Sequence, residues 1–298
     1  MTDAVVRTIS IPSSLRLAAT VRGAKDPVMV GPGESWWSTR TPDGTGTLSL
    51  TRTTDTEVSA EAWGDGAAWL LEQAPKLLGH EDDLHGFEPV GPVADAWTRK
   101  PFLLSRTDRP WDALVGAILG QKVQVTKARQ SRRQLARAFG EPAPGPRRGW
   151  ILPGAHTVAD MAYYDFHPLG VERKRAEIII RVARELRRLP RLTETAEPHE
   201  VKARLERIRG IGPWTTNMVT AVTMGDPDAV PVGDYHIPNT VAWFLQREAR
   251  ATDERMLELL EPYAGHRWRV VRLAKNSGKA PAYGPRMSLT SDGMHRGT

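Results

Sequence analysis

Two short segments constrain the fold of this 298-residue chain more than any others. Residues 205–217 read Leu-Glu-Arg-Ile-Arg-Gly-Ile-Gly-Pro-Trp-Thr-Thr-Asn, which predicts a helix, a tight turn and a second helix. Gly210 and Gly212 allow backbone conformations that a Cβ would block, and Pro213 suits the first turn of the following helix. Main-chain amides at the start of that helix are typical of an anion-binding site.

The second segment, Val-Pro-Val-Gly-Asp-Tyr-His-Ile at residues 230–237, places the carboxylate of Asp234 after a short apolar run and beside an aromatic residue. An anion-binding turn followed by this carboxylate predicts a protein that holds a phosphate backbone and carries out chemistry beside it. Two plainer interpretations stay open at this point. Gly-x-Gly turns also connect ordinary helix hairpins, and Asp234 is also placed to cap a helix that begins near Pro238.

Composition narrows the class of protein. The 41 Lys and Arg exceed the 35 Asp and Glu by six, which favours a polyanionic partner. The chain has no cysteine, so disulfides, zinc–thiolate sites and cysteine-ligated iron–sulfur clusters are excluded. Because no apolar stretch is long enough to span a bilayer and no apolar leader region is seen, we expect a cytoplasmic protein without membrane contact.

The pattern of apolar residues changes near residue 100. Before it, the runs Ala4–Ile11 and Thr47–Thr54 favour strands, and Trp63–Leu78 reads as a helix. After Pro101 the apolar residues recur with helical spacing. We therefore expect an α+β protein with an N-terminal α+β domain over residues 1–100 that contains a small antiparallel sheet, a mostly α-helical domain over residues 101–275, and a disordered polar tail over residues 276–298.

The spacing Leu205-x-x-Ile208-x-Gly210-Ile211-Gly212-x-x-Thr215, with Asp234 beyond it, resembles the helix-hairpin-helix DNA glycosylase superfamily. Residues 111–140 resemble the long helix pair of that family, and residues 169–176 its next connection, so that the likeness covers roughly residues 100–275. Within the superfamily the sequence is most similar to the bacterial 3-methyladenine DNA glycosylase II branch, which excises alkylated bases.

This resemblance implies roles for the two segments. Asp234 would stabilise the positive charge that develops on the sugar, or would deprotonate water. Gly210, Ile211, Gly212 and Thr215 would hold the DNA backbone, with a structural monovalent cation at the hairpin. No cofactor or metal would be needed for catalysis, since a positively charged alkylated base is already a good leaving group.

The resemblance also implies roles for residues around Asp234. The base pocket would be lined by Trp214, Tyr235, Met218 and Arg272, although Trp214 is equally compatible with ordinary core packing. Relatives that also cut the backbone have a lysine at position 214, and an indole has no amine to form a Schiff base, so the resemblance implies a glycosylase without lyase activity. His236 would either support Asp234 through a hydrogen bond or take a direct part.

Gln121 and Lys122 fall where the alkylation branch carries the wedge that enters the DNA stack. Lysine would contact phosphate or the orphan base there, or remain a solvated surface residue. Two further groups are interpreted either as DNA contacts or as plain surface: a basic helix with Arg173, Lys174, Arg175, Arg181, Arg184, Arg187 and Arg188, and a later group with His266, Arg267 and Arg269.

The sequence departs from the alkylation branch at four positions, which are Gly233, Met218, Arg272 and Lys122. The resemblance therefore implies a monofunctional enzyme of base excision repair, acting at the bacterial nucleoid as a monomer on damaged double-stranded DNA, with no obligate protein partner. It would hydrolyse the N-glycosidic bond of alkylated purines such as 3-methyladenine or 7-methylguanine and leave an abasic site. Two alternatives remain: an enzyme for an oxidised, deaminated or bulkier lesion, and a non-catalytic helix-hairpin-helix DNA-binding protein.

Overall fold

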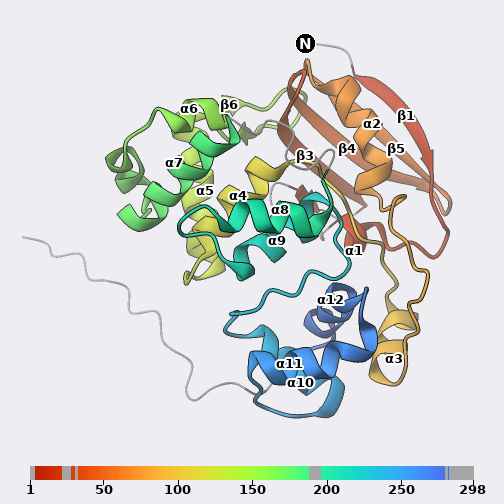
Figure 1. Cartoon of the computed structure of the whole chain (residues 1–298). Coiled ribbons are helices and arrows are strands. Elements are labelled where there is room, and N and C mark those ends of the chain that lie inside the picture. Colours follow the sequence, from red (N-terminus) through yellow and green to blue (C-terminus); the bar gives the residue numbers. More distant parts are fainter. Residues whose placement is uncertain (1–3, 22–27, 31–32, 188–195, 279–280, 282–298) are drawn as a thin grey trace, which may run out of the picture.

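The structure is a computed structural model that describes residues 4–21, 28–30, 33–187, 196–278 and 281. Its N-terminal part is a five-stranded antiparallel sheet with the strand order β1-β5-β4-β3-β2 (Figure 1). The strands are β1 (Val5–Ser10), β2 (Val28–Val30), β3 (Glu34–Thr41), β4 (Gly44–Thr54) and β5 (Glu57–Trp63). The two predicted runs are present as β1 and β4, and the fold class is α+β as expected.

Alternating burial along β3 and β5 gives the sheet one covered face, and α2 (Ala67–Leu77) packs against it. The core between them contains Trp37, Leu48, Leu50 and Leu70. The predicted helix therefore starts later than expected. Trp63 is the last residue of β5 rather than the first of a helix, because it is still paired with Thr47 of β4.

Helices make up most of the remaining described chain (Figure 1). Five of them, with a short 3₁₀ helix η2 (Tyr163–Leu169), build a second core, and a small two-stranded sheet of β6 (Glu141–Pro142) and β7 (Trp150–Ile151) lies beside α5. They are α4 (Pro110–Gly120), α5 (Val125–Phe139), α6 (Ala155–Ala159), α7 (Arg173–Leu186) and α8 (Pro198–Glu206). The next helix, α9 (Pro213–Thr223), packs against α4 and α8.

A third core lies between α3 (Pro92–Arg99), α10 (Ile237–Gln246) and α12 (Arg267–Ser277). The remaining helices are α1 (Leu17–Val21), α11 (Asp253–Leu260) and the 3₁₀ helix η3 (Glu261–Tyr263). Val93, Ala96 and Phe102 belong to this core, together with residues of α10 and α12. The predicted boundary at residue 100 therefore cuts through a packed unit, because these apolar residues are buried against the C-terminal helices rather than against the sheet.

The predicted tail begins close to the end of α12, and nearly all of it lies outside the described residues. Within the described part of the chain, no helix combines the length and apolar character that crossing a membrane requires.

Candidate active site

The turn between α8 and α9 has the conformation that its glycines predict. Gly210 has a φ of 100°, and a Cβ at this position would lie 2.6 Å from the side chain of Ile178 on α7. Glycine is therefore required at 210 both by the backbone and by the close approach of α7. Around Gly212 no atom lies within 4 Å of the position of a Cβ, so this side of the turn is open.

The open side carries main-chain amides without acceptors. The N–H of Ile211 donates to the carbonyl of Ile208 at 2.9 Å and is used inside the turn. Within the described chain, the N–H groups of Gly212, Trp214 and Thr215 have no hydrogen-bond acceptor. Because they lie at the N-terminus of α9, they are the groups of the hairpin that can receive an anion.

Gln121 ties the end of α4 to this hairpin. Its Nε2 donates to the carbonyl of Gly210 at 3.1 Å and to Oγ1 of Thr215 at 3.0 Å. The side chain of Thr215 is thus buried and accepts this hydrogen bond. The amide of Gln121 holds the hairpin against α4, and its predicted role as a wedge or orphan-base contact stays a prediction.

Lys122 follows in an exposed turn between α4 and α5. Its φ of 53° lies in the left-handed region, which costs a non-glycine residue about 1 kcal/mol or more. Gln121, the residue before Lys122, is held by two contacts. Its side chain binds the hairpin, and its carbonyl accepts a hydrogen bond from Nη1 of Arg175 at 3.1 Å. Lys122 is therefore exposed in a turn held in place by its neighbours, and its contact with DNA stays a prediction.

The carboxylate of Asp234 is held by three donors. The indole Nε1 of Trp214 donates to Oδ2 at 2.9 Å, and the main-chain N–H groups of His236 and Ile237 donate to Oδ1 at 2.8 and 3.0 Å. Asp234 thus lies beside the hairpin and accepts the first main-chain N–H groups of α10, as a carboxylate before a helix can, while its part in a reaction stays a prediction. The helix N-terminus and the indole N–H both favour a negative charge at this place.

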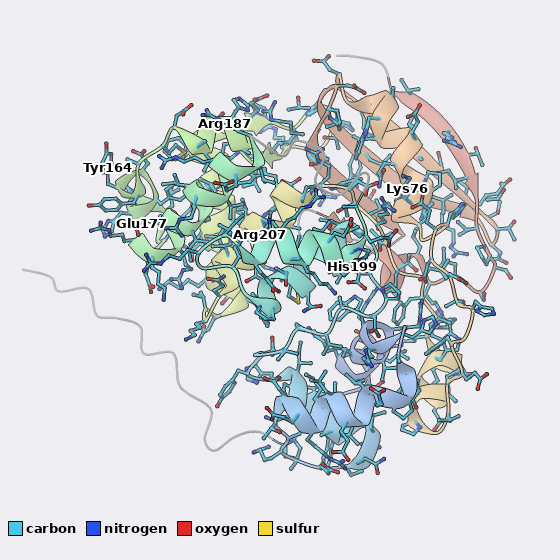
Figure 2. All side chains as sticks on the ribbon, in the orientation of Figure 1. Lys76, Tyr164, Glu177, Arg187, His199 and Arg207 are labelled. Atoms are coloured by element: carbon cyan, nitrogen blue, oxygen red, sulfur yellow. The ribbon has the colours of Figure 1, made fainter. Side chains whose placement is uncertain are left out.

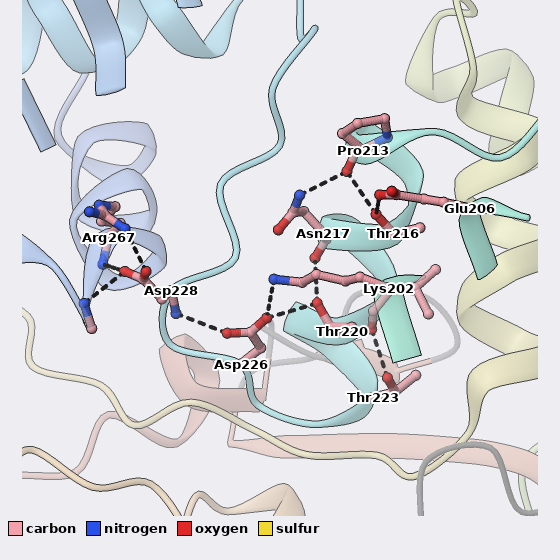
Figure 3. Close-up of polar contacts among 12 residues, drawn as sticks. Lys202, Glu206, Pro213, Thr216, Asn217, Thr220, Thr223, Asp226, Asp228 and Arg267 are labelled. Atoms are coloured by element: carbon pink, nitrogen blue, oxygen red, sulfur yellow. Dashed lines mark hydrogen bonds and ion pairs between the residues drawn. The ribbon is translucent and has the colours of Figure 1, made fainter. Parts of the chain in front are cut away.

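The loop that carries Asp234 is anchored at several points (Figure 3). Asp226 is buried, and its Oδ2 accepts hydrogen bonds from Lys202 at 2.7 Å and from Thr220 at 2.9 Å. Asp228 pairs with Arg267 of α12 at 2.7 Å. Farther along, the N–H of Gly233 donates to Asp253 at 2.9 Å. Anchored to α8, α9, α11 and α12, the loop keeps the carboxylate of Asp234 in a fixed position.

The departure from the alkylation branch at Gly233 has a local reason. Its φ of 87° lies in the left-handed region, which favours glycine. An acidic residue there would be strained and would lie close to Asp253 and Asp234.

The four predicted pocket residues have different surroundings. Trp214 is half-buried and contacts Asp234, and Met218 follows one helical turn later on α9. Tyr235 is 71% exposed, and its ring lies edge-on to that of His236 at 4.8 Å. Tyr235 is therefore at an open mouth of the site rather than in an enclosed wall. His236 contacts Asp234 through its main-chain N–H and not through its ring.

Arg272 is buried, and its contacts lie inside the protein. Its guanidinium donates to the carbonyl of Ala19 at 2.6 Å and lies over the ring of Phe102 at 4.1 Å. Burial lowers the pKa of Arg272 to about 9, and the charge of neighbouring Arg269 adds to the shift. The predicted pocket contact thus finds no support in the contacts of this side chain, which joins α12 to the N-terminal part.

Lys275, at the end of α12, is a charged group near Asp234 that the sequence interpretation missed. Lys275 is exposed as a residue, but the protein atoms around its amine lower the pKa of that amine; the negative charge of Asp234 opposes this shift, and the positive charge of Arg272 adds to it. Lys275 lies 41 positions after Asp234, and only the packing of α12 against α10 brings the two charges together. No motif or spacing in the sequence indicates this pair.

Several side chains of the two predicted basic groups are buried or paired with other groups of the protein. His266 and Arg269 are buried, and Arg267 pairs with Asp228 and Glu261, so that these three residues serve structure rather than a DNA contact. On α7, Arg175 is buried and contacts Gln121, whereas Arg173 pairs with Glu177. Arg188 lies outside the described residues.

The indole N–H of Trp214 makes a testable contribution to the site. Trp214→Phe keeps an aromatic ring but removes the donor to Asp234, and a hydrogen bond to a charged group is worth about 1.5–3 kcal/mol. If Asp234 acts in a reaction on DNA, we expect a rate about 10- to 100-fold lower at saturating enzyme. Single-turnover kinetics measure this, with Trp243→Phe on α10 as the matched control. Equal rates for the two variants would show that the indole does not support the carboxylate.

Comparison with known proteins agrees with this geometry. The model of the HhH-GPD superfamily of base excision DNA repair proteins matches residues 115–264, which is just over half of the chain and contains Gln121, the hairpin and Asp234. The chain belongs to this superfamily.

The individual relatives share only about a quarter of their residues with this chain in the matched region. The putative DNA-3-methyladenine glycosylase YfjP of Bacillus subtilis is 26% identical over 166 residues, which cover 52% of this chain and 55% of that protein. A second Bacillus subtilis protein, a DNA-3-methyladenine glycosylase, is 26% identical over 159 residues, covering 51% of this chain and 52% of the relative. The chain thus spans about half the length of the curated relatives it matches.

Among solved structures, the 3-methyladenine DNA-glycosylase from Archaeoglobus fulgidus has a TM-score of 0.75 and 16% identity, covering 90% of this chain and 97% of the other. At this identity the likeness establishes the fold alone. The α+β architecture with a helix-hairpin-helix domain is confirmed.

Proposed function

We propose that this protein is a DNA glycosylase that excises alkylated purines from duplex DNA by hydrolysis and leaves an abasic site. The observation that carries the proposal is the carboxylate of Asp234, held by an indole and two main-chain donors beside a hairpin with open amides. The names of the two Bacillus subtilis relatives support the alkylated-base class.

The proposed reaction assigns one task to each part of the site. A base must leave the stack before its bond to the sugar can be cut. The hairpin amides would hold a phosphate of the distorted strand, and Lys122 would contact the opened duplex. As the bond breaks, positive charge develops on the sugar, and the fixed carboxylate of Asp234 stabilises it or accepts a proton from the attacking water.

The leaving group needs little help in this scheme. A methylated purine carries a positive charge, so it departs as a neutral base without a general acid. Its electron-poor ring would stack on an electron-rich aromatic surface, for which Trp214 is the half-buried candidate. Neutral oxidised or deaminated bases would need a proton donor, and this favours the alkylated class.

The smaller expectations stay predictions. A monovalent cation at Gly210–Gly212 would bridge the hairpin and a phosphate. Action as a monomer, without an obligate protein partner and in the cytoplasm at the nucleoid, is likewise proposed. Within the described residues, no group of three or more His, Cys, Asp or Glu side chains is placed to hold a metal ion.

The experiment that tests the function is base release from duplex DNA methylated with a radiolabelled agent. We expect 3-methyladenine and 7-methylguanine to appear as free bases, identified by chromatography, at a rate that depends on enzyme concentration. If the protein binds DNA but releases none of these bases, nor oxidised or deaminated ones, the non-catalytic alternative replaces this proposal.

A lyase step is a second candidate, and Lys275 is the observation that favours it, because its amine has a lowered pKa and lies in the field of Asp234. In such a step the amine would attack C1′ of the abasic sugar, water would leave as the Schiff base forms, and elimination would break the bond to the 3′ phosphate. We propose that this step is absent, since the hairpin carries an indole at Trp214 and the amine of Lys275 belongs to α12 rather than to the hairpin.

Borohydride reduction separates the two candidates. With wild-type protein and DNA that contains an abasic site, we expect no covalent adduct, because no amine occupies the hairpin position. An adduct that forms with wild type and disappears with Lys275→Gln would assign lyase activity to Lys275. Lys174→Gln, on α7, is the matched control for loss of one amine.

A further inference from the structure

A groove lined by arginines lies between α7 and α8, next to the hairpin. It has a volume of about 540 Å³. Its floor contains Leu186, Leu205 and Ile208, which are buried. Its charged lining consists of one carboxylate, that of Glu185, and four guanidinium groups, those of Arg181, Arg204, Arg207 and Arg209. Figure 2 labels Arg207 just beyond the end of α8.

Three of these arginines differ from most others in the protein. Arg204, Arg207 and Arg209 are exposed, and within the described part of the chain none of their guanidinium groups has a hydrogen bond or an ion pair. In contrast, Arg255, Arg267 and Arg269 each pair with a carboxylate. Three unpaired cations within six residues repel one another, and an anion in the groove would remove this repulsion.

The groove is continuous with the hairpin. Arg209 immediately precedes Gly210, and the guanidinium of Arg181 donates to the carbonyl of Arg209. A strand whose phosphate lies at the amides of Gly212, Trp214 and Thr215 therefore passes close to the groove. Successive nucleotides of one strand advance by only about 3.4 Å along the helix axis, so neighbouring phosphates lie within reach of both features.

We propose that this groove binds the phosphodiester backbone of DNA, on the strand that continues from the segment held by the hairpin. Guanidinium groups hold phosphate oxygens in bidentate fashion, and the apolar floor offers a surface for the deoxyribose between phosphates. The proposal rests on the proposed function only in that DNA is the substrate. It enlarges the DNA-binding surface from the hairpin to the arginines before it.

The test is the salt dependence of DNA binding by the full chain. The variant Arg204→Gln/Arg207→Gln/Arg209→Gln removes three charges and keeps polar, unbranched side chains. Binding is measured by fluorescence anisotropy with a duplex that carries a tetrahydrofuran abasic analogue, at salt concentrations from about 50 to 200 mM. Each lost phosphate contact should reduce the magnitude of the negative slope of log affinity against log salt by about 0.9. It should also reduce the affinity in 0.1 M salt roughly eightfold.

Matched variants keep the result interpretable. The triple variant Arg16→Gln/Arg99→Gln/Lys100→Gln removes the same charge from exposed residues near α1 and α3, and its slope should stay close to that of wild type. Arg207→Gln alone should lower the slope by about 0.9, and circular dichroism checks that each variant is folded. If the groove and control triples have equal slopes, the proposal is wrong, and an acidic protein becomes the better partner for the groove.

The binding measurement is independent of base release. Excision with an unchanged slope would overturn the groove and leave the function standing. A reduced slope without excision of any base would keep the groove and overturn the function.

Discussion

Asp234→Asn should lower the rate of base release by about 10²- to 10⁴-fold, the range that one positioned acid–base group contributes, while the protein still folds and binds DNA. Asparagine can accept the N–H groups of His236 and Ile237 through its oxygen, so the cap of α10 is kept. Its amide nitrogen then faces the N–H of Trp214, and two donors cannot form a hydrogen bond. The variant thus loses both the negative charge and the contact that orients it.

Single-turnover release from methylated duplex DNA measures this effect, and anisotropy measures binding of the same duplex. Asp160→Asn is the matched control, because this carboxylate is exposed and pairs with Arg187 beyond the end of α7. We expect the control to release base at the wild-type rate. Release by folded Asp234→Asn at that same rate would remove Asp234 from the mechanism.

Arg269→Met should lower the free energy of unfolding by about 3–5 kcal/mol, the cost of leaving a buried charge without its partner. Arg269 and Asp82 have side chains that are 0% and 2% exposed, and their two hydrogen bonds measure 2.9 and 2.7 Å. The guanidinium also lies within 6 Å of the rings of Phe87 and Trp97. Removing it leaves the carboxylate of Asp82 with the main-chain N–H of Leu104 as its remaining donor among the described residues.

Urea unfolding followed by circular dichroism measures the loss. Arg267→Gln serves as the control, because its pairs with Asp228 and Glu261 are partly exposed and should contribute about 1 kcal/mol or less. The double variant Arg269→Met/Asp82→Asn should recover part of the stability, since neither charge is then buried alone. Equal losses of unfolding free energy for Arg269→Met and Arg267→Gln would show that the buried pair contributes no more to stability than the partly exposed pairs.

The elements themselves could be predicted well where a local rule applies. The hairpin follows from glycine at 210 and proline at 213, and the helical stripes before and after it follow from a period of 3.6 residues. The N-terminal part was harder. The apolar neighbours of Trp63 fit both the helical period and the strand period, so the sequence predicts a helix where β5 has not yet ended. No local pattern predicts β3, since its register depends on pairing with β4.

The sequence by itself determined the superfamily, the hairpin and the place of Asp234 before α10, because these depend on backbone conformation and on spacing within a few residues. Only the tertiary structure decided which side chains meet. Gln121 and the hairpin are 89 residues apart, Trp214 and Asp234 are 20 apart, and Arg269 and Asp82 are 187 apart. The same is true of Lys275 and of the third core around α3. Such contacts follow no period along the chain, because they depend on how whole helices pack against one another.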